Sequence, residues 1–340
     1  MTDDVIILLL KLLLFLFFSF SSPLSHPNNM EKVRWLFQEP IVVNVLPAAM
    51  LLTVDKLLFR VHHWPSGVLL AVLHLLCNFL SLHILRLRGV FTRAVDIPFA
   101  VVMSICLPLS SATAVQTLSL KANSFGTFVL LKQLVLPCTA LAELALGQRS
   151  LSMGHWIALC GIFAGVVFAT AKEMNENPVG IAIGLLDTTL SVTGQMVLSH
   201  YLRAKIAAPL QLRYETYLRG GWVVIITLMF EIAMDRDSIS FRRYDWCSVG
   251  SWGVLLASCV LSPVVSVSYY FVVGKYSALV YQLLQPLKLV IAMALSSVLL
   301  GDSLTQRQQV SAGITCLSLC YWALLSKEKE GKEKEKEKGT

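Results

Sequence analysis

Apolar stretches long enough to cross a membrane follow one another along most of the chain, separated by short polar connections. A helix crosses the roughly 30 Å of bilayer hydrocarbon with about 20 apolar residues. These stretches are too long for strands and lack the alternation of a half-buried strand, and a helix satisfies its own backbone hydrogen bonds in lipid. The pattern predicts an all-α polytopic membrane protein with about ten transmembrane helices. The expected helices cover residues 40–59, 65–86, 95–117, 123–143, 153–171, 178–200, 212–233, 250–273, 277–300 and 308–325.

Composition supports this class, since 56% of the residues are hydrophobic and only 14% are charged. The mean hydropathy is +0.68, and a soluble chain of this length would need far more polar surface. The net charge of +7 comes largely from the connections and a lysine-rich tail, so it indicates membrane orientation rather than nucleic-acid binding. The excess of Lys and Arg in alternate connections places both termini in the cytosol.

The first 37 residues fit three interpretations. Residues 5–20 are apolar but short, are interrupted by Lys11 and are followed by SSPLSHPNN. They are typical of a signal-like segment, a signal anchor, or upstream sequence preceding a later start at Met30. A further span here would break the parity that places both termini in the cytosol.

Two lysines lie inside apolar stretches of membrane-spanning length, Lys132 in the first half of the chain and Lys288 in the second. A lysine at the bilayer centre costs about 3 kcal/mol on insertion scales, so it is expected to face a cavity or a partner. The pair predicts a membrane-embedded site for an anion. The alternatives are a salt bridge with Asp187 or Asp55, or extension of the lysine toward the interface.

The two halves of the chain also resemble each other in order and spacing. Each places a lysine before an apolar run, then Leu-Gly-Gln or Leu-Gly-Asp, a Ser/Thr turn and a glycine-bearing span. Five expected helices per half mean that the halves insert in opposite senses, as in transporters built from inverted repeats. The predicted organisation is an N-terminal segment 1–37, two five-helix repeats 38–174 and 175–326, and a cytosolic Lys/Glu tail 327–340.

Two segments carry a family resemblance: LKANSFGTFVLLK, ending at Lys132, and SALVYQLLQPLK, ending at Lys288. They resemble the triose-phosphate translocator and nucleotide-sugar transporter branch of the drug/metabolite transporter superfamily. The resemblance implies an alternating-access carrier of anionic substrates. The sequence departs from the family at Gln285-Pro286, where relatives carry Gly-His, and at Leu289, where the plastid sugar-phosphate translocators carry Arg. The Gly-Ala-Leu-Asn-Lys motif of GDP-mannose carriers is missing.

Three further side chains are candidates for the site of Lys132 and Lys288. Tyr281 lies seven residues before Lys288, on the same helical face, although interface packing explains it equally well. Ser277 lies four residues before Tyr281, where a helix cap is the alternative. Tyr214 resembles the aromatic patch that opens the seventh span of nucleotide-sugar carriers, with an interfacial anchor as the alternative.

These features favour a secondary transporter that exchanges a nucleotide sugar for a nucleoside monophosphate across an early-secretory membrane. Lys336 and Lys338 near the C-terminus resemble a dilysine signal for retrieval to the endoplasmic reticulum, which leaves Golgi and endoplasmic reticulum open. The alternative is a sugar-phosphate/phosphate or other organic-anion exchanger of the same family. The chain has neither a catalytic motif nor cysteine spacing typical of a metal site, so we expect no enzyme, cofactor or metal. A homodimer is left open.

Overall fold

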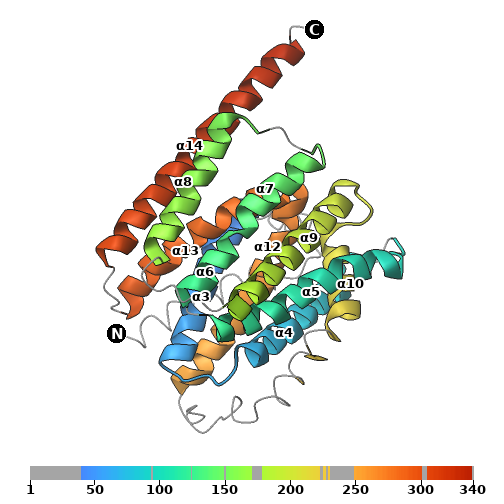
Figure 1. Ribbon diagram of the computed structural model, residues 1–340. Coiled ribbons are helices and arrows are strands. Elements are labelled where there is room, and N and C mark those ends of the chain that lie inside the picture. The colour runs from blue at the N-terminus through green and yellow to red at the C-terminus, as the bar shows by residue number, and fades with distance from the viewer. Residues whose placement is uncertain are drawn as a thin grey trace.

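The computed structural model describes residues 40–92, 95–123, 125–148, 151–170, 178–222, 225, 226, 229, 249–300 and 305–338. The N-terminal segment 1–37, with its three interpretations, lies outside the described residues. Within them, every regular element is a helix, and the helices pack into one bundle from which the last helix projects (Figure 1). The described helices are α3 (Pro40–Arg60), α4 (Gly67–Leu87), α5 (Phe99–Ala122), α6 (Phe125–Gln133), α7 (Val135–Ala145), α8 (Met153–Thr170), α9 (Pro178–Arg203), α10 (Pro209–Gly220), α12 (Val249–Lys275), α13 (Ala278–Leu300) and α14 (Gln306–Lys338).

Six of these helices are long and apolar enough to cross a membrane. The finding confirms an all-helical polytopic membrane protein, while the count of ten spans and the inverted repeat stay predictions. One expected helix, 123–143, is divided into α6 and α7 by a turn at Leu134. The last helix runs on to Lys338, through most of the expected tail, because Lys and Glu are both good helix formers.

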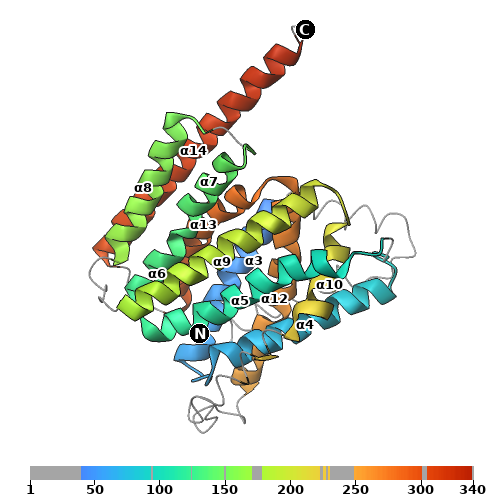
Figure 2. The same cartoon turned by 45° about the vertical axis from the view of Figure 1, so that its right-hand side comes forward.

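Small residues allow neighbouring helices to approach closely. Helices α8 and α14 lie side by side in both views (Figures 1 and 2). A Cβ atom added at Gly161 would lie 2.3 Å from the hydroxyl of Ser318, and one at Gly165 would lie 2.6 Å from the hydroxyl of Thr315. Close backbone approach at small residues is the usual way to pack helices in lipid, where burial of apolar surface adds little. These glycines therefore allow α8 and α14 to pack closely against each other.

Helix α3 packs against both α12 and α13. Asn44 donates to Ser268 of α12 at 2.9 Å, and Lys56 donates to Ser296 of α13, also at 2.9 Å. Both α12 and α13 belong to the second half of the chain. Helix α13, which carries Tyr281 and Lys288, is therefore held against an element from the first half.

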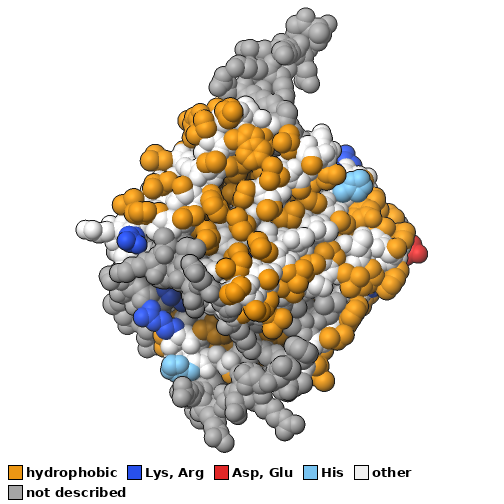
Figure 3. All heavy atoms as spheres, in the orientation of Figure 1, with side chains coloured by type: hydrophobic (Ala, Val, Ile, Leu, Met, Phe, Trp, Pro, Cys, Tyr) orange, Lys and Arg blue, Asp and Glu red, His pale blue; other side chains and the backbone are white. Residues whose placement is uncertain are grey.

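The outer surface of the bundle is apolar. Figure 3 shows hydrophobic side chains over most of the visible described face, and basic side chains near its edges. Large apolar side chains are widely exposed, for example Val42 at 62% and Leu80 at 54%. A soluble monomer rarely exposes so much contiguous apolar surface. Together with the six long apolar helices, this surface identifies an integral membrane protein.

Candidate functional site

Lys132 of α6 forms an ion pair inside the bundle. Its Nζ atom lies 3.2 Å from Oδ2 of Asp187 on α9 and donates to Oε1 of Gln116 on α5 at 2.8 Å. The Asp187 side chain is only 3% exposed, whereas that of Lys132 is 33% exposed. The salt bridge is the alternative that the sequence raised beside anion binding, and it compensates the charge of this lysine.

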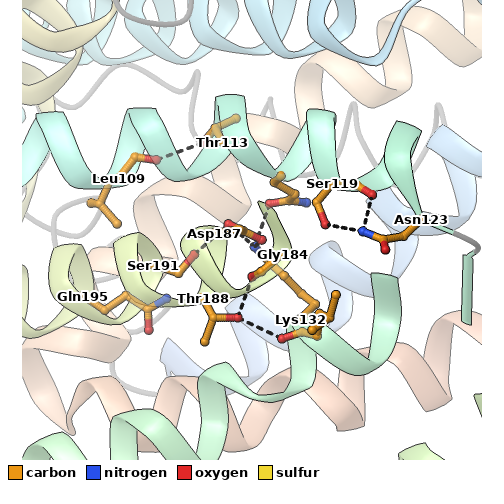
Figure 4. Close-up of polar contacts among 12 residues, drawn as sticks. Leu109, Thr113, Ser119, Asn123, Lys132, Gly184, Asp187, Thr188, Ser191 and Gln195 are labelled. Atoms are coloured by element: carbon orange, nitrogen blue, oxygen red, sulfur yellow. Dashed lines mark hydrogen bonds and ion pairs between the residues drawn. The ribbon is translucent and has the colours of Figure 1, made fainter. Parts of the chain in front are cut away.

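The surrounding contacts fix the carboxylate in place (Figure 4). Ser191, one turn further along α9, donates to Oδ1 of Asp187 at 3.2 Å. Thr188 donates to the carbonyl oxygen of Leu131 at 3.0 Å and so ties α9 to the backbone beside Lys132. The ion pair is thus part of a three-helix polar cluster made by α5, α6 and α9.

Lys288 of α13 has a different environment. Lys288 as a whole is 2% exposed, and its Nζ atom lies 4.3 Å from the centre of the Tyr281 ring. None of the carboxylates that the structure describes lies within ion-pair distance of it. The seven-residue spacing indeed places Tyr281 and Lys288 on one face of a single helix. A buried lysine whose charge has no carboxylate partner is suited to an anionic ligand.

Three tyrosine rings lead from Lys288 toward α12. The rings of Tyr281 and Tyr269 are 4.4 Å apart, and those of Tyr269 and Tyr270 are 5.4 Å apart. The hydroxyl of Tyr269 is buried and has no hydrogen-bond partner among the described protein groups. A buried hydroxyl without a partner is costly, so it is a candidate donor to a ligand.

Arg213 of α10 stands at the far end of these rings. Its Cζ atom lies 4.6 Å from the centre of the Tyr270 ring and 4.1 Å from that of Tyr217. Its Nε atom donates to Ser266 at 2.9 Å, and its Nη1 atom donates to Tyr270 at 3.2 Å. Like Lys288, it has no ion-pair partner in the described part of the chain.

Sequence reasoning missed Arg213 because the residue lies at the start of the expected span 212–233, where a basic residue is typical of the membrane interface. The four-residue spacing between Arg213 and Tyr217 was the available signal, since it places both on one helical face. Tyr269 and Tyr270 were missed because consecutive aromatic residues in an apolar run are normally packing residues.

Tyr214 lies away from these rings. It is 2% exposed and stacks on Phe79 of α4 with ring centres 5.6 Å apart. Its hydroxyl accepts from Arg86 at 3.1 Å. The structure therefore places Tyr214 in the packing between α4 and α10, whereas its roles in substrate binding and as a membrane-interface anchor stay predictions.

Ser277 lies at the start of α13. Its hydroxyl accepts from the backbone N–H of Val280 at 3.1 Å, which is the capping role that was its alternative. Glu143 of α7 reaches the same helix start and accepts from the backbone N–H of Leu279 at 3.0 Å. A carboxylate at a helix N-terminus is favourable, so two side chains anchor the helix that carries Lys288.

The arrangement matches the chemistry of a nucleotide. Two basic side chains, for which the described residues provide no carboxylate partner, lie at the ends of a row of tyrosines, which we call the tyrosine row (Tyr270, Tyr269 and Tyr281). An ammonium and a guanidinium both bind phosphate oxygens, and aromatic rings offer faces and hydroxyls to a base or sugar. Lys132 contributes no such free charge, because Asp187 neutralises it.

Comparison with known proteins finds carriers that resemble this chain over most of its length. UDP-xylose transporter 3 of Arabidopsis thaliana is 24% identical over 281 residues, which cover 83% of this chain and 78% of the relative. UDP-xylose transporter 1 from the same plant is 23% identical over 285 residues, 83% of this chain and 82% of the relative. The chain is a relative of the nucleotide-sugar transporters. This confirms the resemblance that rested on the segments ending at Lys132 and Lys288.

These nucleotide-sugar transporter relatives are carriers rather than enzymes, in agreement with the expectation from the sequence. No protein-family model matches the chain. A solved crystal structure shares the fold with a TM-score of 0.66 at 13% identity, and the match covers 85% of this chain and 98% of the other.

Proposed function

We propose that this protein is a secondary transporter that exchanges a nucleotide sugar for a nucleoside monophosphate across a Golgi or endoplasmic reticulum membrane. One observation carries the proposal: Lys288 and Arg213 lie at opposite ends of the tyrosine row, and neither has a carboxylate partner among the described residues. The similarity to carriers named for UDP-xylose supports the substrate class. Both termini lie in the cytosol in this proposal.

The geometry favours a nucleoside diphosphate sugar, and the similarity to carriers named for UDP-xylose makes a uridine diphosphate sugar the first substrate to test. The diphosphate has two negative groups for the two basic side chains, and the tyrosine row offers faces to uracil or the sugar. A sugar phosphate has a single phosphoryl group and no base to place on the rings. Leu289, where the plastid translocators carry Arg, argues against that alternative as well.

Alternating access explains how a buried lysine receives a substrate. Lys288 is 2% exposed, so helices must move before a ligand reaches it. We place this movement between two inverted repeats, 38–174 and 175–326. Their packing supports the proposal, because α3 lies on α12 in the second repeat as α9 lies on α5 in the first.

Obligatory exchange follows from electrostatics in this proposal. Two basic side chains without counter-ions are costly to bury away from water. The transition between outward and inward states is therefore favoured only when an anion occupies the site. The loaded carrier changes between its outward-facing and inward-facing states, whereas the empty carrier remains in the state in which it released its substrate.

The test is exchange in proteoliposomes containing purified protein. Vesicles are loaded with UMP, GMP, CMP, AMP or inorganic phosphate and are offered labelled UDP-xylose, other nucleotide sugars or triose phosphate. We expect uptake of a UDP-sugar that requires UMP inside. Uptake that requires phosphate inside would move the protein to the sugar-phosphate class.

Variants then connect the activity with the site. Lys288→Ala is expected to abolish exchange while the protein remains inserted and monodisperse, because the buried positive charge is lost. The matched control is Lys205→Ala, at an exposed lysine, which should exchange at the wild-type rate. Normal exchange by Lys288→Ala would contradict the proposed site.

A further inference from the structure

A line of polar side chains runs between α4 and α12, outside the tyrosine row. His74 and Asn78 are four residues apart on α4, and Ser258, Ser262 and Ser266 have the same spacing on α12, so each set lies on one helical face. His74 Nε2 lies 2.7 Å from the Ser258 hydroxyl, and Ser262 donates to Oδ1 of Asn78 at 3.1 Å. We call these five residues the α4–α12 polar seam.

One end of the seam holds a carboxylate. Ser258 donates to Oδ1 of Asp55 on α3 at 2.5 Å, so a single hydroxyl bridges Asp55 and His74. The serine stands between the acid and the imidazole, whereas a nucleophilic triad places the histidine in the middle. The order therefore suits the movement of a proton between two titratable groups and not the activation of a nucleophile.

The other end of the seam reaches the proposed substrate site. Asn78 donates to the hydroxyl of Tyr217 at 2.8 Å, Tyr217 hydrogen-bonds to Ser266, and Arg213 donates to Ser266 at 2.7 Å. Ser258, which binds Asp55, and Ser266, which binds Arg213, are eight residues apart on α12, a rise of about 12 Å. A change of charge at Asp55 therefore acts on the anion site across about two helical turns, in a medium of low dielectric that screens it little.

The two hydrogen bonds of Ser258 permit two complementary proton arrangements. In the first, His74 carries protons on both nitrogens and Asp55 is ionised; Nε2–H donates to Ser258, and Ser258 donates to Asp55. The Nε2 proton then passes to the Ser258 oxygen as the Ser258 proton passes to Asp55 Oδ1. The products are a neutral imidazole that accepts from Ser258 and a neutral carboxyl that donates to it, so atoms and charge balance.

Other titratable groups face this site from the helices packed around it. Lys56 follows Asp55 but is bonded to Ser296 of α13. The thiols of Cys259 on α12 and Cys77 on α4 lie next to each other and near Asp55. At greater distance, His62 contacts Ser251 at 2.8 Å, Lys288 of α13 faces the Tyr281 ring, and Arg213 closes the far end. Asp55 is thus the acidic group among neighbours that are basic or neutral.

We propose that Asp55, Ser258 and His74 form a proton-binding site, and that the proton bound there is coupled to transport at the neighbouring anion site. The coupling rests on the proposed function, whereas the binding of the proton does not. No cluster of three or more metal-ligating side chains is found within the described ranges, and two titratable groups bridged by one hydroxyl suffice for a proton.

Infrared spectroscopy tests proton binding without any substrate. Purified protein is titrated between about pH 5 and pH 8, and the carbonyl-stretch band of a protonated carboxyl group is followed. We expect a band that titrates in the wild type and in Asp96→Asn, an exposed control, but is missing from Asp55→Asn. A wild-type spectrum without such a band, or an unchanged band in Asp55→Asn, would overturn the site.

A pH gradient across proteoliposomes tests the coupling. If one proton moves per exchange cycle, one unit of pH gradient shifts the equilibrium ratio of internal to external nucleotide sugar about tenfold, at a fixed nucleoside monophosphate gradient and with the membrane potential clamped to zero. We expect this shift in the wild type and in Ser104→Ala, whose hydroxyl donates to the carbonyl oxygen of Val101 in its own helix, and its loss in Asp55→Asn and Ser258→Ala. Exchange that ignores the gradient would overturn the coupling and leave the proposed function standing. A titrating band in protein that exchanges no nucleotide would overturn the proposed function and leave the proton-binding site standing.

Discussion

The ion pair between Lys132 and Asp187 allows a quantitative test, because its two side chains differ in burial. Lys132→Met removes the ammonium and leaves a carboxylate that is 3% exposed. Removing one partner of a buried pair costs about 3–5 kcal/mol, because an uncompensated charge stays buried. Ser191 remains as a single hydrogen-bond donor to that carboxylate, so we expect a loss of about 3 kcal/mol.

Asp187→Asn should cost less. The ammonium that remains is 33% exposed, keeps its hydrogen bond to Gln116 and gains an amide oxygen. Because the remaining ammonium keeps hydrogen-bond acceptors on two sides, we expect a smaller loss, about 1 kcal/mol. The double variant Lys132→Met/Asp187→Asn has no charge left to compensate and should be more stable than Lys132→Met alone.

Thermal unfolding in detergent, followed by tryptophan fluorescence, measures these differences. At about 2 °C per kcal/mol for a chain of this size, Lys132→Met should lower Tm by roughly 6 °C and Asp187→Asn by roughly 2 °C. Exchange in proteoliposomes should survive in the double variant, because the pair contributes no free charge to the anion site. A reversed order of the two single variants, or strictly additive effects, would refute the reasoning. Loss of exchange in the folded double variant would restore Lys132 as a substrate-binding residue.

Three further outcomes follow from particular contacts. Gly161→Ala should lower stability by about 1–3 kcal/mol in thermal unfolding, because the added Cβ atom would overlap Ser318. The control is Gly313→Ala, which has open space around it and should be neutral or slightly stabilising in the same measurement. Tyr269→Phe should raise the KM for nucleotide sugar several-fold without lowering Tm, since its hydroxyl bonds to no described protein group. Glu143→Leu should destabilise the start of α13 by about 1 kcal/mol, detectable as faster amide exchange around Leu279.

The sequence by itself determined where helices form. Runs of apolar residues as long as a bilayer is thick have one economical structure in lipid, and described helices occur within each predicted range. It also determined relations within a single helix, because they depend only on the helical period. Tyr281 and Lys288 are the example: their seven-residue spacing predicted a shared face, and the structure places the amine over the ring.

Only the tertiary structure decided which side chains meet across helices. Lys132 and Lys288 look equivalent in sequence, yet Asp187 neutralises the first and no described carboxylate approaches the second. Arg213 lies at the site because α10 packs beside α12; from the sequence it was recognised only as a residue at the start of a span. In a membrane, lipid-facing and buried surfaces are equally apolar, so the pattern along one helix does not reveal which face meets a partner. The charge of the site is a property of helix packing, and packing is set by contacts between residues far apart in the chain.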